Sequence, residues 1–283
     1  MDHKMSPVIK AQELLHLIEA PSLILIDASA GPGARDNYLK KHLKGALYAD
    51  LEKQLAEVPQ NAANGGRHPL PDTAKFARVL GNLGISTDSH VIIYDDKNGA
   101  NAAARLWWML KAFGHEKVQV LDGGFKAALE ANFPLNSGEE NHLKHADYPA
   151  QNWQLPIANI EETGTAALDK NSLVIDVRDA FRYNGESEPI DLIAGHIPGA
   201  ENIPFGSNLD SEGFFLDPSV LNKKYSEALR GLPPGRVIVH CGSGVTACHT
   251  LLAMDYAGLD IPKLYVGSWS EWSRNDLPIA TKR

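Results

Sequence analysis

The chain has 283 residues, with 27 Lys and Arg against 35 Asp and Glu and a formal net charge of −8 at pH 7. This length exceeds that of a usual single hydrophobic core, so we expect two domains, and the acidic balance argues against nucleic acid or an anionic membrane as the main partner. No apolar run reaches the roughly 18 residues that a bilayer span needs, and the first 20 residues lack a cationic and then apolar leader pattern, so we expect a cytoplasmic protein.

The first half of the chain alternates short apolar runs with segments of helical period. Residues 23–26, which precede Asp27, and residues 91–94 are continuous apolar runs, which is typical of strands buried on both faces of a parallel sheet. Residues 73–80 and 102–113 carry apolar side chains at helical spacing. This alternation predicts an α/β fold in which helices flank a parallel sheet.

The second half repeats these features in the same order. Matching segments are 23–27 and 173–176, 42–46 and 196–200, 91–95 and 237–241, 123–125 and 267–269, and 133–135 and 277–279. The members of each pair lie between 144 and 154 residues apart, which indicates an internal duplication. We therefore expect a domain over residues 1–140, a polar linker over 141–155 and a second domain over 156–283.

Cys241 is the residue that separates the two halves chemically. It follows the strand predicted at 237–240 and opens the segment Cys-Gly-Ser-Gly-Val-Thr. The glycines let the backbone turn its N–H groups inward, and a helix beginning near Val245 adds the positive end of its dipole, so both favour the reactive thiolate. The first half has Asp95 in this place, so we expect the reaction in the second half alone. A buried, inert cysteine in a glycine-containing turn is the alternative.

Together these segments resemble the tandem-domain form of the rhodanese family of sulfurtransferases. The resemblance covers both halves and is carried by residues 195–200, 241–247 and 267–272, and by 105–108 with 113–115. It implies two rhodanese-like domains, each a parallel sheet flanked by helices. It also implies a cysteine that takes up a sulfane sulfur as a persulfide and passes it to a thiol or another nucleophile.

The resemblance also implies roles for single residues. Arg182 matches an arginine that binds the anionic donor, and a guanidinium can grip a carboxylate with two parallel hydrogen bonds. Ser243 matches a loop serine that can relay a proton, and His68 matches the histidine of a Cys-His-Ser/Asp arrangement. Glu52 is a candidate for the carboxylate that orients His68, in competition with Asp50. The loop residues expected to surround the donor are Gly242, Gly244, Val245 and Thr246.

Other interpretations of these residues stay open. Arg182 could be a surface arginine paired with Glu186 or Glu188, Ser243 a serine that favours a turn, and His68 a solvated loop histidine. Residues 241–246 are similar to the mercaptopyruvate version of the loop, since the thiosulfate version carries cations after its cysteine. Residues 188–192, however, stand where mercaptopyruvate enzymes usually have a second arginine, and they are closer to the thiosulfate branch.

The predicted activity is the transfer of sulfur from 3-mercaptopyruvate to a thiol or cyanide through a Cys241 persulfide, with thiosulfate as the alternative donor. We expect a small-molecule donor and a thiol acceptor, for which a thioredoxin-like protein is one candidate, and no cofactor. We expect no metal either, because no cysteine and histidine cluster has ligand spacing. A cysteine phosphatase would need an arginine where Ala247 stands, and a non-catalytic module would have no use for an intact Cys241.

Several other polar residues are expected to be structural. Asp27 and Asp176 end equivalent strands, and His42 and His196 recur at the same place in both halves. Cys248 lies about two helical turns after Cys241, which predicts a position in a helix core.

Overall fold

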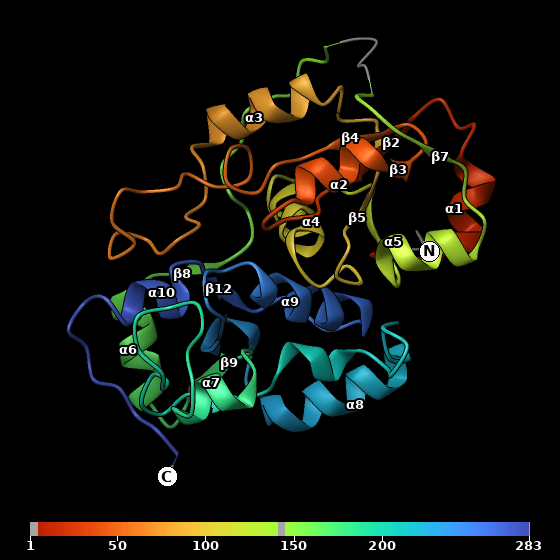
Figure 1. The fold of residues 1–283 in the computed structure, drawn as a ribbon. Helices are drawn as coiled ribbons and strands as arrows, with labels where there is room; N and C mark the ends of the chain where they lie inside the picture. Colours follow the sequence, from red (N-terminus) through yellow and green to blue (C-terminus); the bar gives the residue numbers. More distant parts are fainter. Residues whose placement is uncertain (1–4, 141–144, 283) are drawn as a thin grey trace. The chain divides into compact units, whose positions relative to one another are not determined.

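A computed structural model describes residues 5–140 and 145–282 as two compact units (Figure 1). Unit 1 is drawn from Met1–Leu55, Pro71–Gln154 and Ser211–Phe215. Unit 2 is drawn from Ala56–Leu70, Leu155–Asp210 and Leu216–Arg283. Each unit therefore takes in one short segment from the other half of the sequence.

Unit 1 is built on a five-stranded parallel sheet in the order β1-β6-β5-β2-β4. A separate antiparallel pair joins β3 to β7. The elements are β1 (Val8–Ile9), α1 (Ala11–Leu17), β2 (Leu23–Asp27), α2 (Ala34–Lys40), β3 (His42–Leu43), β4 (Ala46–Tyr48), α3 (Thr73–Asn82), β5 (His90–Tyr94), α4 (Ala102–Ala112), β6 (Val118–Leu121), α5 (Gly124–Glu130) and β7 (Leu135–Asn136).

Unit 2 has a second parallel sheet, in the order β10-β9-β11-β12-β8. The elements are β8 (Ile157–Ala158), α6 (Ile160–Leu168), β9 (Leu173–Asp176), α7 (Ala180–Asn184), β10 (Glu201–Asn202), the 3₁₀ helix η1 (Phe205–Asn208), α8 (Pro218–Leu229), the 3₁₀ helix η2 (Pro234–Arg236), β11 (Val237–His240), α9 (Thr246–Tyr256), β12 (Lys263–Tyr265) and α10 (Ser268–Trp272). Read in reverse, as β8-β12-β11-β9-β10, this order corresponds to β1-β6-β5-β2-β4 of unit 1. The predicted α/β duplication is confirmed.

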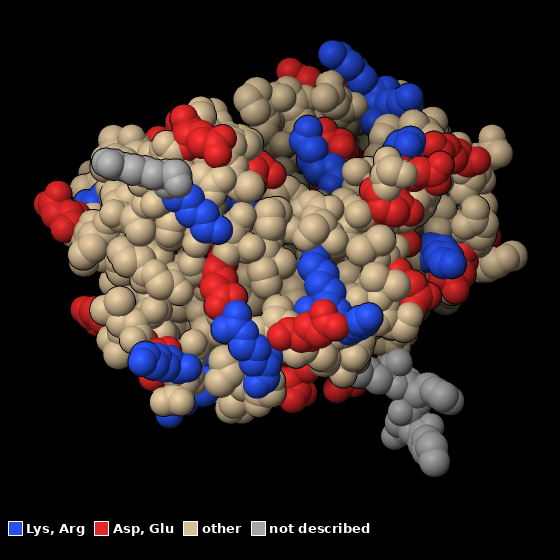
Figure 2. All heavy atoms as spheres, turned by 90° about the horizontal axis from the view of Figure 1, so that it is seen from below, with Lys and Arg blue, Asp and Glu red and all other residues tan. Residues whose placement is uncertain are grey.

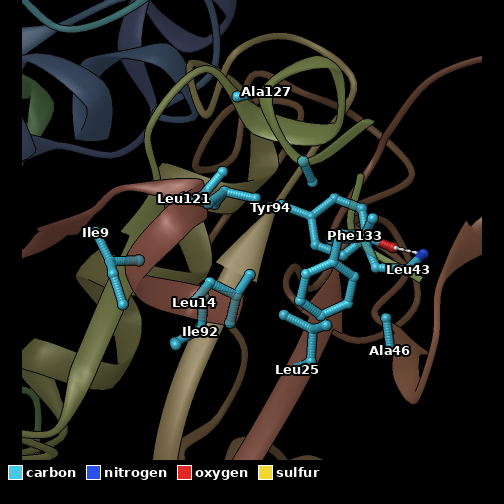
Figure 3. Close-up of a cluster of buried hydrophobic side chains, with 12 residues drawn as sticks. Ile9, Leu14, Leu25, Leu43, Ala46, Ile92, Tyr94, Leu121, Ala127 and Phe133 are labelled. Carbon is cyan, nitrogen blue, oxygen red and sulfur yellow. Dashed lines mark hydrogen bonds between the residues drawn. The ribbon is translucent and has the colours of Figure 1, made fainter. Parts of the chain in front are cut away.

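The sheet of unit 1 is buried on both faces. Leu25, Ile92 and Tyr94 lie in one apolar cluster with Leu14 of α1 and Ala127 of α5 (Figure 3). The residues that alternate with them along the strands point to the opposite face and are also buried: Ile26, Val91 and Ile93. Burial on both faces explains why the strands are continuous apolar runs in the sequence.

Unit 2 repeats this packing with larger side chains. Val174, Ile238 and Tyr265 form a cluster with Trp269 and Trp272 of α10. Both tryptophans are almost fully buried, and each indole N–H donates to a backbone carbonyl, of Ile193 and of Pro278 respectively. The cluster thereby fixes α10, which follows the strand next to β11.

One pair of aromatic residues recurs in both units. In unit 1 the ring of His42 stacks on Tyr38 at 4.1 Å between centroids, and in unit 2 the ring of His196 stacks on Tyr183 at 3.7 Å. In each pair the histidine Nδ1 lies 2.7 Å from the backbone oxygen of its tyrosine. Both histidines are buried, in agreement with the expected structural role.

The region predicted as a linker is only partly described, because residues 141–144 lie outside the described residues, as do residues 1–4 at the start of the first predicted domain. Trp153 packs on Phe76 and Phe113, and Tyr148 stacks on Phe113. These aromatic residues attach 148–153 to unit 1. The domain boundaries at 140 and 156 stay predictions.

Charged side chains of both signs are interspersed on the face drawn in Figure 2, and neither sign covers it as one continuous patch. Within residues 5–140 and 145–282, we find no helix with both the length and the apolar character needed to cross a bilayer.

Candidate active site around Cys241

Cys241 lies directly after β11, in the loop that leads into α9. Its side chain is almost fully buried, with 1% of the residue exposed. Its backbone oxygen accepts from Trp269 N–H at 3.0 Å, and the backbone oxygen of Gly242 accepts from Ser270 N–H at 2.8 Å. Two successive residues of the loop are therefore held by the first turn of α10.

Ser268 holds the cysteine from the same side. The N–H of Cys241 donates to Ser268 Oγ at 3.1 Å, and Ser268 Oγ in turn donates to the backbone oxygen of Tyr265 at 2.8 Å. Ser268 has φ +54°, in the left-handed region that favours glycine, and Gly124 has φ +57° at the matching place in unit 1. Ser268 therefore accepts from the Cys241 N–H in a backbone conformation that costs free energy in any residue other than glycine. The sequence did not identify Ser268 as a site residue, although its pairing with Gly124 was a signal.

The loop after Cys241 contains three backbone N–H groups that are available as hydrogen-bond donors. Gly244 adopts φ +70° and α9 begins at Thr246, so the chain turns sharply before the helix. Within the described part of the chain, the N–H groups of Ser243, Val245 and Thr246 have no hydrogen-bond partner. Such N–H groups at a glycine turn and a helix start can bind an anion.

In the corresponding loop of unit 1, the backbone N–H groups donate to the carboxylate of Asp95. The carboxyl group of Asp95 is fully buried and accepts from the N–H groups of Lys97, Gly99, Asn101 and Ala103 at 2.8 to 3.1 Å. Asp95 thus occupies the place where the loop of unit 2 could hold a ligand.

The segment that carries His68 packs on α10 and on the turn before it. The N–H of Gly65 donates to Glu271 Oε1 at 2.9 Å, and the N–H of Arg67 donates to Ser270 Oγ at 3.0 Å. A Cβ atom at Gly66 would lie 2.3 Å from the backbone oxygen of Gly267, so only glycine permits this approach. The result is that Nδ1 of His68 lies 2.8 Å from Ser243 Oγ. The structure therefore brings together two of the predicted site residues.

Arg182 of α7 is buried and already paired. Its Nε lies 3.0 Å from both carboxylate oxygens of Glu188, and its Nη2 lies 2.7 Å from Glu188 Oε1 and 3.2 Å from Asp191 Oδ2. Burial lowers the pKa of Arg182, but the Glu188 and Asp191 carboxylates and the charge at Cys241 raise it above its ordinary value. Arg182 is thus not a surface residue, although it does pair with Glu188 as the alternative interpretation expected.

Asp191 joins Arg182 to two further arginines that sequence reasoning missed. Arg67 Nε donates to Asp191 Oδ1 at 3.0 Å, and Arg274 Nη1 reaches the same oxygen at 3.4 Å. The Asp191 carboxylate is fully buried, so these guanidinium groups balance its charge. Residues 188–192 lack the arginine expected from the resemblance, and Asp191 within them instead contacts arginines of other segments.

Glu52 is an exposed residue of unit 1, and its N–H donates to Asp50 Oδ1 at 3.0 Å. Cys248 is buried within α9, as expected, and its thiol donates to the backbone oxygen of Gly244 at 3.3 Å. No group of three or more His, Cys, Asp and Glu side chains suited to a metal ion occurs in the described ranges.

Comparison with known proteins places these features in a family. A model of the rhodanese-like domain matches twice, at residues 10–131 and 161–275. A Pseudomonas aeruginosa protein named "Probable 3-mercaptopyruvate sulfurtransferase" is 42% identical over 97% of this chain and 98% of its own. The thiosulfate sulfurtransferase of Rattus norvegicus is 36% identical over 91% of this chain and 87% of its own.

Solved structures agree with this result. The crystal structure of SseA from Escherichia coli, which is described in connection with 3-mercaptopyruvate sulfotransferases, has a TM-score of 0.75 and 33% identity. The match covers 94% of this chain and 100% of SseA. The family predicted from the sequence is confirmed: the chain belongs to the rhodanese-like family, with one rhodanese-like domain in each half.

Proposed function

We propose that this protein is a sulfurtransferase that carries sulfur as a persulfide on Cys241, with 3-mercaptopyruvate as the donor. The observation that carries the proposal is the set of loop N–H groups beside a buried cysteine that make no hydrogen bond with any described residue, whereas Asp95 accepts from the N–H groups of the duplicate loop. Relatives named for 3-mercaptopyruvate and for thiosulfate support the reaction class.

The first half-reaction forms one bond and breaks one. The Cys241 thiolate attacks the donor sulfur, an S–S bond forms, and the C–S bond of mercaptopyruvate breaks with its electron pair going to carbon. The leaving group is the enolate of pyruvate, which takes up a proton and becomes pyruvate. We assign that proton transfer to Ser243 and His68, and the hydrogen-bond distance between the serine hydroxyl and the imidazole supports the assignment.

The second half-reaction regenerates the enzyme. An acceptor thiolate or cyanide attacks the outer sulfur, and the bonding pair returns to Cys241 as the thiolate. Until then the persulfide anion is stabilised by the N–H groups of Ser243, Val245 and Thr246. We propose a thiol acceptor in a cytoplasmic setting, with a thioredoxin-like protein as one candidate.

The donor carboxylate requires a cation, which we assign to Arg182. Its Nη2 lies 3.4 Å from the point that a Cβ atom on Gly242 would occupy, so the guanidinium borders the loop. Its Nη1 makes no hydrogen bond with any described residue. Cations beside the loop also suit thiosulfate, which keeps thiosulfate as the alternative donor.

Mass spectrometry after donor treatment tests the proposal. Incubation with 3-mercaptopyruvate without an acceptor should add about 32 Da to the peptide that contains Cys241, and addition of cyanide should remove it with formation of thiocyanate. Cys248→Ala is the matched control and should still gain the sulfur, whereas Cys241→Ser should not. A wild-type protein that gains no sulfur from either 3-mercaptopyruvate or thiosulfate would contradict the proposal.

A further inference from the structure

We propose that Arg67 is a second anion-binding residue of the donor site and acts beside Arg182. The inference rests on the proposed function and adds to it the residue that selects donors by their negative charge. The observation that carries it is the convergence of two guanidinium groups on Gly242, one from each of two distant segments.

Gly242 shows how closely the two arginines approach the loop. A Cβ atom built on Gly242 would lie 3.2 Å from Arg67 Nη2, 3.3 Å from Asp191 Oδ2 and 3.4 Å from Arg182 Nη2. Gly242 directly follows the nucleophile, so both positive charges border the position from which a donor reaches Cys241. A larger residue at 242 would crowd both guanidinium groups.

Asp191 holds Arg67 in this position. Arg67 donates from Nε to Asp191 Oδ1 at 3.0 Å and from Nη2 to Oδ2 at 3.5 Å, and Oδ2 also accepts from Arg182. One buried carboxylate therefore spaces the two guanidinium groups. We assign Asp191 a positioning role.

The arginines around Asp191 outnumber the carboxylates, so the cluster has positive charge available to bind an anion. Arg67, Arg182 and Arg274 share Asp191, and Glu188 is the other carboxylate bonded to Arg182. The Nη1 atoms of Arg67 and Arg182 make no hydrogen bond with any described residue. A carboxylate or a sulfonate-like oxygen can accept from such groups, and hydrogen bonds between ionised partners are the strong ones.

Arg274 provides a matched control within the same cluster. Its Nη1 donates to Asp191 Oδ1 at 3.4 Å and also to the Ser270 backbone oxygen. The atoms nearest to a Cβ on Gly242 belong to Arg67, Asp191 and Arg182, not to Arg274. Arg274→Gln removes a positive charge and an Asp191 contact without removing a cation that borders Gly242. Any effect that Arg67→Gln has and Arg274→Gln lacks therefore arises at the loop.

The first measurement compares donor kinetics. For Arg67→Gln we expect KM for 3-mercaptopyruvate to rise by about tenfold or more, with kcat changed by less than about threefold. Arg274→Gln should change both by less than about threefold. Unchanged KM in Arg67→Gln would overturn the inference, as would an equal rise in both variants, because the effect would then pass through Asp191.

The second measurement does not require sulfur transfer. Iodoacetate and iodoacetamide alkylate thiols and differ mainly in the negative charge, so the ratio of their rates at Cys241, followed by peptide mass spectrometry, reports on cations near the thiol. We expect this ratio to fall by about tenfold in Arg67→Gln, while the iodoacetamide rate and the ratio in Arg274→Gln stay near wild type. A ratio unchanged by Arg67→Gln would count against the inference.

Together the two measurements separate the inference from the proposed function. If wild type never forms a persulfide, the function fails, and the alkylation ratio still decides whether Arg67 attracts anions to Cys241. If a persulfide forms and neither KM nor the ratio responds to Arg67→Gln, only the inference fails. Should Arg67→Gln prove unstable by thermal unfolding, Arg67→Met, which is also uncharged, carries the same test.

Discussion

Ser243 Oγ lies 2.8 Å from Nδ1 of His68, although 175 positions separate the two residues in the chain. The contact depends on the Ala56–Leu70 segment, which packs within unit 2, and on the turn after Cys241. If the pair moves one proton as a unit, removing either member should lower kcat about as much as removing both. We expect decreases on the order of 10- to 100-fold in His68→Ala, in Ser243→Ala and in the double variant.

The pair can be tested by a double-mutant cycle on kcat for 3-mercaptopyruvate, with persulfide formation followed by rapid quench. Effects of the single variants that multiply in the double variant would show that the residues act independently. Cys248→Ala serves as the control, since Cys248 is buried within α9 and its thiol donates to the backbone oxygen of Gly244.

Arg182 is paired with Glu188 and is proposed to bind the donor, and a single substitution would remove both interactions. Arg182→Gln should raise KM for the donor, and it should also destabilise the protein by about 3 kcal/mol or more, because the buried Glu188 would keep Arg178 as its one remaining ionic partner among the described residues. The double variant Arg182→Gln/Glu188→Gln also removes the buried carboxylate that had lost Arg182, so we expect it to recover much of that stability while KM stays high. Urea unfolding and steady-state kinetics measure the two effects separately. Recovery of a wild-type KM in the double variant would exclude Arg182 from donor binding.

Glu188 makes the stability of unit 2 depend on pH. Burial alone would raise the pKa of Glu188, but hydrogen bonds from Arg182 and from the Asp191 N–H lower it below the ordinary value of 4.5. A carboxyl group with a lowered pKa stabilises the folded state above its unfolded value, and this stabilisation is lost as pH falls through the folded value.

We therefore expect the free energy of unfolding to decrease as pH falls below about 4.5, and to decrease less steeply in Glu188→Gln. The comparison is made by urea unfolding over a series of pH values. Glu186→Gln is the control, because Glu186 is exposed and its carboxylate accepts from the Asn184 side chain rather than from a buried arginine. Equal slopes in wild type and Glu188→Gln would show that Glu188 is not the source of the dependence.

Gly244 is predicted to tolerate no side chain. It adopts φ +70°, and a Cβ atom would lie 2.5 Å from the backbone oxygen of Val266. Gly244→Ala should therefore destabilise the protein by about 2 kcal/mol or more and move the N–H groups that follow Cys241, so persulfide formation should slow. Gly206→Ala is the control, since nothing lies within 4 Å of a Cβ atom there and φ is not positive. Thermal unfolding and rapid-quench mass spectrometry measure the two effects, and equal behaviour of the two variants would contradict the prediction.

Much of this arrangement could be predicted from local sequence pattern. The apolar runs that end at Asp27, Asp95 and Cys241 predicted strands correctly, because burial on both faces of a parallel sheet leaves a continuous apolar signature. The predicted helices at 73–80 and 102–113 are α3 and α4, with boundaries within about two residues.

The arginine cluster could not be predicted in this way. Arg67 precedes His68 in a segment without periodicity, and its partner Asp191 is 124 positions away in another loop. The charges of single loop residues carry no information about which carboxylate they meet. Only the packing of Gly65, Gly66 and Arg67 against α10 and the turn before it determines that contact.

Asp95 limits how much sulfur one molecule can hold. Its carboxyl group belongs to the same loop whose N–H groups it binds, so a dissolved donor would have to displace an intramolecular partner. Saturation with donor should consequently end at one transferable sulfur atom per polypeptide, whatever the excess supplied. We therefore expect a duplicated fold with two similar loops to carry sulfur on one of them alone.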